Sequence, residues 1–178
     1  AVVCEGFEAG GHNGREETTT FTLIPMVKEQ VKIPVIAAGG IGSGRGMLAA
    51  MVLGANGVQV GSRFAATKES SAHENFKQAI VNVKDGDTEL TLKELAPVRL
   101  VKNKFYQQIQ ELYKLNPTKE EIKKLLGRAR AKKGMFEGDL ENGELEIGQV
   151  AGMIYEIKSA KEVIDEMMQE FDAVKKHF

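Results

Sequence analysis

The stretch Glu5-Gly6-Phe7-Glu8-Ala9-Gly10-Gly11-His12-Asn13-Gly14 follows the short apolar run Ala1-Val2-Val3-Cys4. A β-branched run that stops at glycines indicates a buried strand that opens into a tight loop, because Gly adopts backbone conformations that other residues avoid. We therefore predict that His12 lies on the loop, outside the strand. Histidine is the side-chain type that exchanges protons near neutral pH, so the stretch predicts a reaction site at the mouth of a ligand pocket. The alternative is a histidine that merely caps a turn.

Composition places the chain among ordinary globular proteins. It has 178 residues, of which 42% are hydrophobic and 28% charged, with a formal net charge of −1. This balance argues against a nucleic-acid partner. No run of 18 apolar residues and no signal peptide is present, so we expect no membrane span. The single cysteine, Cys4, cannot form an internal disulfide, and we expect a buried thiol in a reducing cytoplasm. The chain begins directly in a strand and without Met, so we expect that a preceding segment is missing.

The first third of the chain repeats a strand, a glycine loop and a helix. Helical spacing begins at Leu23 and continues to residue 31, with preceding threonines as expected N-caps. A second apolar strand follows at residues 33–38, a helix at 45–53 and a third strand at 58–60. Apolar strands that alternate with helices indicate a parallel sheet covered on its faces. Such folds build their ligand sites in the loops after the strands.

The glycine run at residues 40–44 does not fit the dinucleotide-binding pattern G-x-G-x-x-G, because a non-glycine residue stands where the third glycine is required. A Rossmann fold is therefore disfavoured. Two neighbouring loops, with Gly39 and Gly40 in one and Gly61 and Ser62 in the other, instead favour a phosphate held near a helix N-terminus, as a barrel does after its last two strands. Glycines needed only for tight turns are the alternative.

Three motifs resemble the FMN-dependent barrel family that contains the nitronate monooxygenases and the flavin type of enoyl-[acyl-carrier-protein] reductase. They occur in the family's order, at residues 5–14, 34–41 and 57–64. Later segments, at 68–73, 97–104, 137–143 and 148–152, resemble the reductase branch more than the monooxygenase branch. Ser62 stands where the family usually has Thr, and Ser43 where Asp is common. The resemblance covers nearly all of the chain.

This resemblance implies an α/β fold, the C-terminal part of a TIM (β/α)8 barrel with an added mostly helical segment. A complete barrel takes about 250 residues, so we expect only the last three strand units here. The expected divisions are residues 1–66 for these units, 67–148 for a mostly helical inserted subdomain, and 149–178 for C-terminal helices that return to the barrel.

The resemblance also implies the site and the reaction. We expect FMN as the cofactor, NADH or NADPH as the reductant, and a 2-enoyl thioester linked to acyl carrier protein or to CoA, in fatty-acid synthesis. His12 is assigned to proton handling, and no metal ligands are assigned. The expected flavin contacts are Gly10 and Gly11 at the ring, Gly39, Gly40, Gly61 and Ser62 at the phosphate, and, more weakly, Gln59 and Gln149.

Two other functions stay open. The first is nitronate oxidation by FMN and oxygen, with the same His12 as the base. The second is a non-catalytic module that binds flavin or phosphate. Beyond the substrate, the expected partners are the missing N-terminal half of the barrel and a second copy in a homodimer.

The remainder of the chain predicts helices at 71–83, 104–115 and 118–126, with a capping box from Thr118 to Glu121. A short strand or loop is expected within 90–100. An apolar stripe that begins after Ser159 predicts a final helix with these residues in the core: Val163, Ile164, Met167, Met168, Phe171 and Val174. A basic concentration between residues 123 and 133 indicates a solvated helix face or a dock for an acidic carrier protein. His73 and His177 are expected at the surface.

Overall fold

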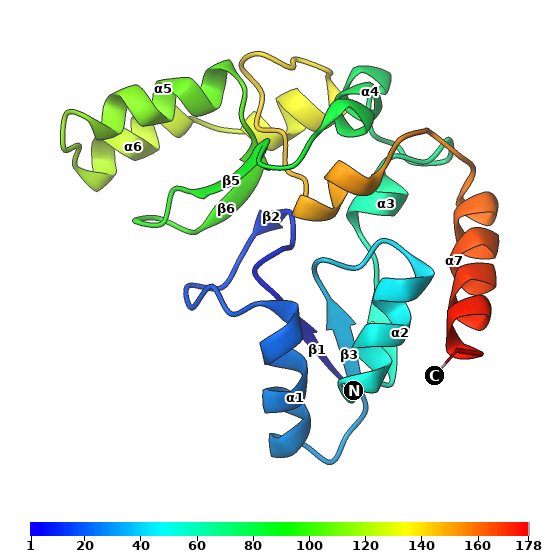
Figure 1. Ribbon diagram of the computed structural model, residues 1–178. Coiled ribbons are helices and arrows are strands. Elements are labelled where there is room, and N and C mark those ends of the chain that lie inside the picture. Colours follow the sequence, from blue (N-terminus) through cyan, green and yellow to red (C-terminus); the bar gives the residue numbers. More distant parts are fainter. Residues whose placement is uncertain (178) are drawn as a thin grey trace.

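The fold is described from a computed structural model and covers residues 1–177 (Figure 1). Its first sheet consists of β1 (Val2–Glu5), β3 (Val35–Ala38) and β4 (Gly57–Gln59), in the order β1-β3-β4. Both strand pairs are parallel. The predicted parallel arrangement of three strand units is thus confirmed, with strand boundaries that shift by one or two residues.

Helices cover one face of this sheet. Cys4 of β1 and Ala37 of β3 are paired neighbours on that face, and they join a buried cluster with Ile24 of α1 (Thr20–Gln30) and Ala50 of α2 (Gly44–Val52). Both helices lie on the same face because right-handed crossovers between adjacent parallel strands place them there. On the opposite face Val3 stays 49% exposed. The expectation that both faces are covered is therefore wrong for the described residues.

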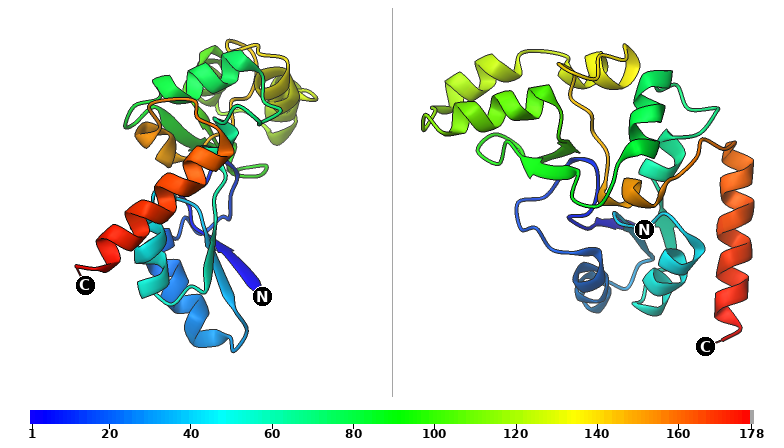
Figure 2. Two further views of the ribbon diagram at one scale, coloured as in Figure 1. Left: turned by 90° about the vertical axis from the view of Figure 1, so that its right-hand side faces the viewer. Right: turned by 45° about the horizontal axis from the view of Figure 1, so that its top comes forward.

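The long helix α7 (Ala160–Lys175) packs along α2 on the outside of the sheet (Figures 1 and 2). A Cβ on Gly44 would lie 2.2 Å from the carbonyl oxygen of Met167, so glycine is what allows this close approach. Val163 and Met167 are buried in α7, whereas Ile164 and Met168 are 50% and 46% exposed. The predicted core stripe is thus too wide, because only the side chains that face α2 are covered.

A second sheet lies beyond the carboxyl ends of the first (Figure 1). It is antiparallel, in the order β2 (Gly11–His12), β6 (Val98–Val101) and β5 (Thr88–Thr91). Two strands of it stand where the sequence predicted one short strand or loop. The long-range pairing of residues 11 and 12 with β6 had no local signal in the sequence.

Short helices surround the second sheet. Thr118 caps α6 in a full capping box with Glu121, as predicted. Two apolar clusters lie here, one around Phe76 and Ile80 and one around Phe105 and Ile109. The helices are α3 (Ser62–Ala65), α4 (Glu74–Asn82), α5 (Lys104–Tyr113), α6 (Lys119–Leu126), the π-helix η1 (Lys132–Phe136) and the 3-10 helix η2 (Gln149–Met153). Within residues 1–177 no helix has the length and apolar character needed to cross a membrane.

Candidate active site

A cavity of about 270 Å³ opens at the carboxyl ends of the parallel strands, and we call it the glycine cavity. Its floor includes the last residue of each strand: Glu5 of β1, Ala38 of β3 and Gln59 of β4. These three residues are paired neighbours, so they lie on one face of the sheet, opposite the face that α1 and α2 cover. This is the edge where parallel α/β folds place their ligands.

Six of the predicted site residues line the glycine cavity: Gly10, Gly39, Gly40, Gln59, Gly61 and Ser62. The backbone explains two of them. Gly39 and Gly40 have φ values of +85° and +69°, and a Cβ on Gly39 would lie 2.5 Å from the carbonyl oxygen of Gly6. The turn after β3 therefore requires glycine at both positions, whatever the cavity binds.

Gly61 differs from these turn glycines. Its φ of −102° suits any residue, and a Cβ there would have nothing within 4 Å. Within the described residues, no hydrogen bond uses the backbone N–H of Gly40, Gly61 or Ser62. The cavity wall therefore has open space at Gly61 and three nearby amides without a protein acceptor, which is an arrangement that an anion or a phosphate group can use.

The segment at residues 147–148 closes the cavity against the loop after β1. The Ser62 hydroxyl accepts a hydrogen bond of 3.0 Å from the Gly148 N–H. A Cβ on Gly10 would lie 2.3 Å from the carbonyl carbon of Ile147, so Gly10 permits this contact. Gln149 takes part only through its backbone N–H, which donates to the Glu8 carbonyl oxygen at 3.0 Å. Gln149 itself is exposed and does not line the cavity.

His12 lies in a strand, so the prediction of a loop position is wrong. Gly11 and His12 form β2 and pair with Arg99 and Val98 of β6. His12 is exposed and lines a neighbouring cavity of about 220 Å³, which we call the histidine cavity. Gly11 has a φ of +73°, and a Cβ on it would lie 2.6 Å from a carboxylate oxygen of Glu146. The structure thus places the imidazole beside the glycine cavity and not inside it.

Sequence reasoning missed the carboxylates of the site. Glu5, Glu8 and Glu146 line the glycine cavity, whereas no Lys, Arg or His is among its described lining residues. Burial raises the pKa of both Glu5 and Glu146. Glu8 accepts hydrogen bonds from the Thr20 N–H at 2.9 Å and from its hydroxyl at 3.0 Å. Glu8 therefore caps α1 in place of the predicted threonines, since Thr19 makes no capping hydrogen bond.

Arg99 holds the loop that carries the predicted contacts. It is only 2% exposed, and its guanidinium donates to the Phe7 carbonyl oxygen at 3.0 and 3.2 Å. The same group lies 4.5 Å from the centre of the Phe7 ring, a cation–π contact. Burial lowers the pKa of Arg99, while Glu89, Glu8 and Glu17 oppose that shift. No sequence pattern indicated this role, because the two segments are far apart in the chain.

The N-terminus of α2 is closed to a ligand. A carboxylate oxygen of Glu170, on α7, accepts from the Gly44 N–H at 2.7 Å and from the Arg45 N–H at 3.3 Å. This glutamate satisfies the dipole and the first amides of the helix. Of the two helix starts that follow the glycine loops, the one at Ser62 keeps its amides available.

The basic concentration is largely paired with acidic neighbours. Lys123 pairs with Glu120, and Lys132 with Glu137. Lys133 pairs with Asp139 at 3.0 Å. Arg130 donates to three backbone carbonyl groups. This arrangement supports the interpretation as a solvated face over that as a dock for an acidic carrier. Among residues 1–177, no group of three or more His, Cys, Asp or Glu side chains is placed to hold a metal ion.

A protein-family model described as nitronate monooxygenase matches residues 1–170. A probable nitronate monooxygenase of Staphylococcus haemolyticus is 48% identical over 99 residues, which are 51% of this chain and 28% of that protein. A second one, of Staphylococcus saprophyticus, is 42% identical over 120 residues, or 62% of this chain and 34% of the relative.

Two solved structures align with nearly the whole chain. FabK from Thermotoga maritima is 43% identical with a TM-score of 0.89, over 99% of this chain and 55% of that one. The nitroalkane oxidase of Streptomyces ansochromogenes is 29% identical with a TM-score of 0.80, over 99% of this chain and 52% of that one. The chain thus spans about half the length of these structures and about a third of the curated relatives it matches.

Proposed function

Because the chain belongs to the nitronate monooxygenase family, we propose that the glycine cavity is an FMN site and that the protein reduces 2-enoyl thioesters with NAD(P)H. The main support for an FMN site is the backbone conformation and the surroundings of Gly61. The fold does not require glycine there, since the φ of −102° suits any residue and a side chain would meet open space. A ligand that lies close to the backbone would explain the glycine, because a side chain at this position would block the ligand.

The residues of the cavity fit a flavin mononucleotide in two respects. The free amides of Gly40, Gly61 and Ser62 offer donors for a terminal phosphate without a basic side chain. Gly10 and Ile147 offer a narrow, largely apolar wall for a flat ring. When bound, a flavin supplies hydride transfer between a nicotinamide and a substrate. The chain's own residues hold the ligand, shape the cavity and handle protons.

We assign proton handling to His12. It is exposed and stands at the edge of the neighbouring histidine cavity, where solvent can supply or remove a proton. Its strand pairing with Val98 fixes the backbone that carries the imidazole. His12 therefore has access to a substrate that extends from the glycine cavity into the histidine cavity, without itself being needed for cofactor binding.

Two observations favour the reductase over the oxidase. Segments after Phe64 resemble those of flavin enoyl reductases, and one of them, residues 148–152, supplies Val150 to the glycine cavity. FabK, an enoyl-[acyl-carrier-protein] reductase, also aligns at higher identity than the nitroalkane oxidase does. Nitronate oxidation is the second candidate, and the names of the curated relatives favour it.

Flavin retention tests the cofactor proposal. In protein expressed from the full open reading frame, we expect Gly61→Val to lose FMN on purification, because its side chain enters the space beside the free amides. Cys4→Ala is the control, since it trims a buried residue outside the cavity at a cost of about 1 to 2 kcal/mol. Equal flavin absorbance in the two variants would contradict the assignment of the phosphate site.

Steady-state assays of the same protein test the reaction. We expect oxidation of NADH or NADPH that depends on crotonyl thioester and yields the saturated thioester. Oxygen consumption with propyl nitronate and without nicotinamide would instead support the oxidase. Activity with neither substrate in flavin-loaded protein would favour a module that binds flavin without catalysis.

A further inference from the structure

The side of β6 that faces away from β5 brings together residues that are far apart in the sequence. His12 pairs with Val98, Gly11 pairs with Arg99, and Glu146 forms an isolated antiparallel bridge with Leu100. Successive residues of a strand face opposite sides, so Val98 and Leu100 face the same side of the sheet. Residues paired across strands share a face, and therefore His12 and Glu146 project on one side.

Glu144 joins them through the same extended segment. It precedes Glu146 by two residues, so its side chain projects on the same side. The segment is held in place by hydrogen bonds from the Glu144 N–H to the Arg130 carbonyl at 3.0 Å and from the Val101 N–H to the Leu145 carbonyl at 2.9 Å. His12, Glu144 and Glu146 all line the histidine cavity. Among them only Glu146 also lines the glycine cavity.

The two carboxyl groups lie in apolar surroundings without a direct partner. Glu144 is only 7% exposed, and within the described residues no side-chain hydrogen bond or ion pair joins either carboxyl group to another residue of the cavity wall. The apolar lining of the cavity consists of Leu92, Leu95, Ala96, Val98, Leu126, Ala129 and Ala131. The carboxylate oxygens are not among the fully buried atoms that lack a partner, so solvent reaches them, but the apolar walls still raise the cost of ionising both groups.

Two other charged or titratable groups act on this pair. Arg130 lines the same cavity, but its guanidinium donates to the carbonyl groups of Leu125, Leu126 and Asn142 and lies over the Phe105 ring. Burial, followed by the charge of Glu146, raises the pKa of Glu144 to about 7, and Arg130 opposes this shift. Burial raises the pKa of Glu146, and His12 opposes it.

We propose that Glu144 and Glu146 share one proton near neutral pH and that Glu146 carries it between the histidine cavity and the glycine cavity. This proposal rests on the proposed function, in which the β-carbon of the enoyl thioester gains hydride and the α-carbon gains a proton. The O–H bond of the Glu146 carboxyl group breaks as the α-carbon C–H bond forms, and Glu146 becomes a carboxylate. Solvent then returns a proton to the pair through the exposed imidazole of His12.

The proton sharing can be tested without turnover, by carbon NMR of protein with ¹³C-labelled glutamate carboxyl groups. We expect a glutamate signal that titrates near neutral pH and disappears in Glu144→Gln. In Glu146→Gln the remaining Glu144 signal should titrate at lower pH, with a proton affinity about tenfold weaker, because a neighbouring negative charge is gone. Glu146→Asp keeps a carboxyl group and should keep most of the coupling.

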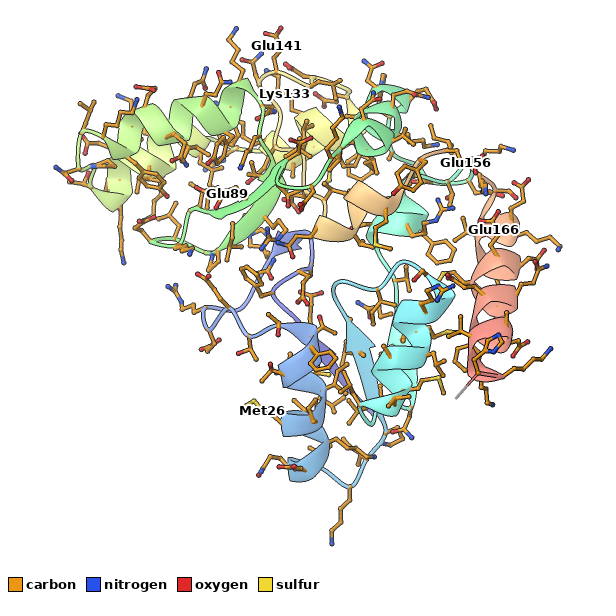
Figure 3. All side chains as sticks on the ribbon, in the orientation of Figure 1. Met26, Glu89, Lys133, Glu141, Glu156 and Glu166 are labelled. Carbon is orange, nitrogen blue, oxygen red and sulfur yellow. The ribbon has the colours of Figure 1, made fainter. Side chains whose placement is uncertain are left out.

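Glu141→Gln is the matched control, since Glu141 lies on the outer surface away from both cavities (Figure 3) and its side chain is 70% exposed. It should leave the neutral-range signal unchanged. Titration of both Glu144 and Glu146 in the ordinary glutamate range, or a Glu144 signal that Glu146→Gln does not move, would overturn the proton sharing.

The pH profile of turnover tests the role of Glu146 in the reaction. We expect Glu146→Gln to retain flavin, to lower kcat at least tenfold and to remove the neutral inflection of the kcat profile, while Glu141→Gln keeps all three properties. An unchanged profile in Glu146→Gln would overturn the proton transfer. If the substrate assays fail while the NMR coupling is present, the proposed reaction is wrong and the shared proton still stands.

Discussion

The two walls of the site differ in what they offer a ligand. The wall built by the parallel strands presents backbone amides and glycines together with the carboxyl groups of Glu5 and Glu8, and has no basic side chain among its described lining residues. The wall built along the edge of β6 presents His12, Glu144 and Glu146, which are titratable side chains. Under the proposed function, the free amides of the first wall would bind the anionic group of the cofactor, and the second wall would exchange protons. The proposal thus assigns cofactor binding and proton exchange mainly to different sheets.

The sheets also differ in how they are held together. The wall built by the parallel strands, which we call the glycine wall, depends on local turns such as the one at Gly39, whose φ is +85°. We call the wall that carries His12, Glu144 and Glu146 the titratable wall. The titratable wall depends on contacts between segments distant in the chain, with Arg99 fastening β6 to the Phe7 carbonyl. Substitutions in the two walls should therefore separate flavin binding, stability and turnover.

The largest effect should come from His12. We expect His12→Ala to retain FMN and to slow turnover by about 10² to 10⁴-fold, the usual contribution of a group that handles the reaction's proton, here by returning it to Glu146. Flavin absorbance of the purified protein and kcat with crotonyl thioester are the measurements. His177→Ala, at an exposed position near the end of the chain, is the control and should change neither. Loss of flavin from His12→Ala would show that His12 is also needed for cofactor binding, which contradicts the division of roles between the two walls.

Gly39→Ala should act on the fold. The φ of +85° strains any side chain, and the added Cβ would lie 2.5 Å from the Gly6 carbonyl oxygen. We expect a loss of unfolding free energy on the order of 3 kcal/mol from the combined strain and overpacking. Urea denaturation measures it. A loss below about 1 kcal/mol would mean that the turn relaxes easily and that this wall is less rigid than we infer.

Glu144 should make the unfolding free energy of the protein depend on pH. Its pKa is raised from 4.5 to about 7 in the folded protein, so the folded state binds the proton more tightly than the unfolded state does. The unfolding free energy should therefore fall as the pH rises from 4.5 to 7, by on the order of 2 kcal/mol. Denaturation of Glu144→Gln should lack this component, whereas Glu141→Gln should retain it. Equal pH dependence in both variants would place the neutral titration elsewhere.

The glycine wall could be predicted from the sequence because its signals are local. Apolar runs that end at glycines indicated the three strand units and their loops, and Gly10, Gly39, Gly40, Gln59, Gly61 and Ser62 do line the cavity. In the titratable wall only His12 was predicted from the sequence. Its neighbours Glu144 and Glu146 could not be, since β6 brings residues 12 and 146 together and no local pattern encodes that pairing.

Helix ends and helix faces show the same limit. Glu8 caps α1 and Glu170 caps α2, each from a distant part of the chain, so neither could be identified from residues next to the helix. Periodicity located α7 but not the width of its buried face, which depends on how α2 lies against it. In both cases the sequence indicated the helix, whereas tertiary packing determined which residues cap it and which of its side chains are buried.

The smallest effect on stability should come from Gly61→Ala, and this makes it the sharpest comparison within the glycine wall. The position has an ordinary φ of −102° and open space, so the added methyl group meets no protein atom. A compatible Gly→Ala change is neutral or stabilising by up to about 1 kcal/mol, because it restricts the unfolded chain. We therefore expect urea denaturation without added flavin to show no loss of stability, in contrast to Gly39→Ala, while the affinity for FMN falls. A destabilised Gly61→Ala protein would show that the fold itself needs this glycine, and the observation that carries the flavin proposal would lose its force.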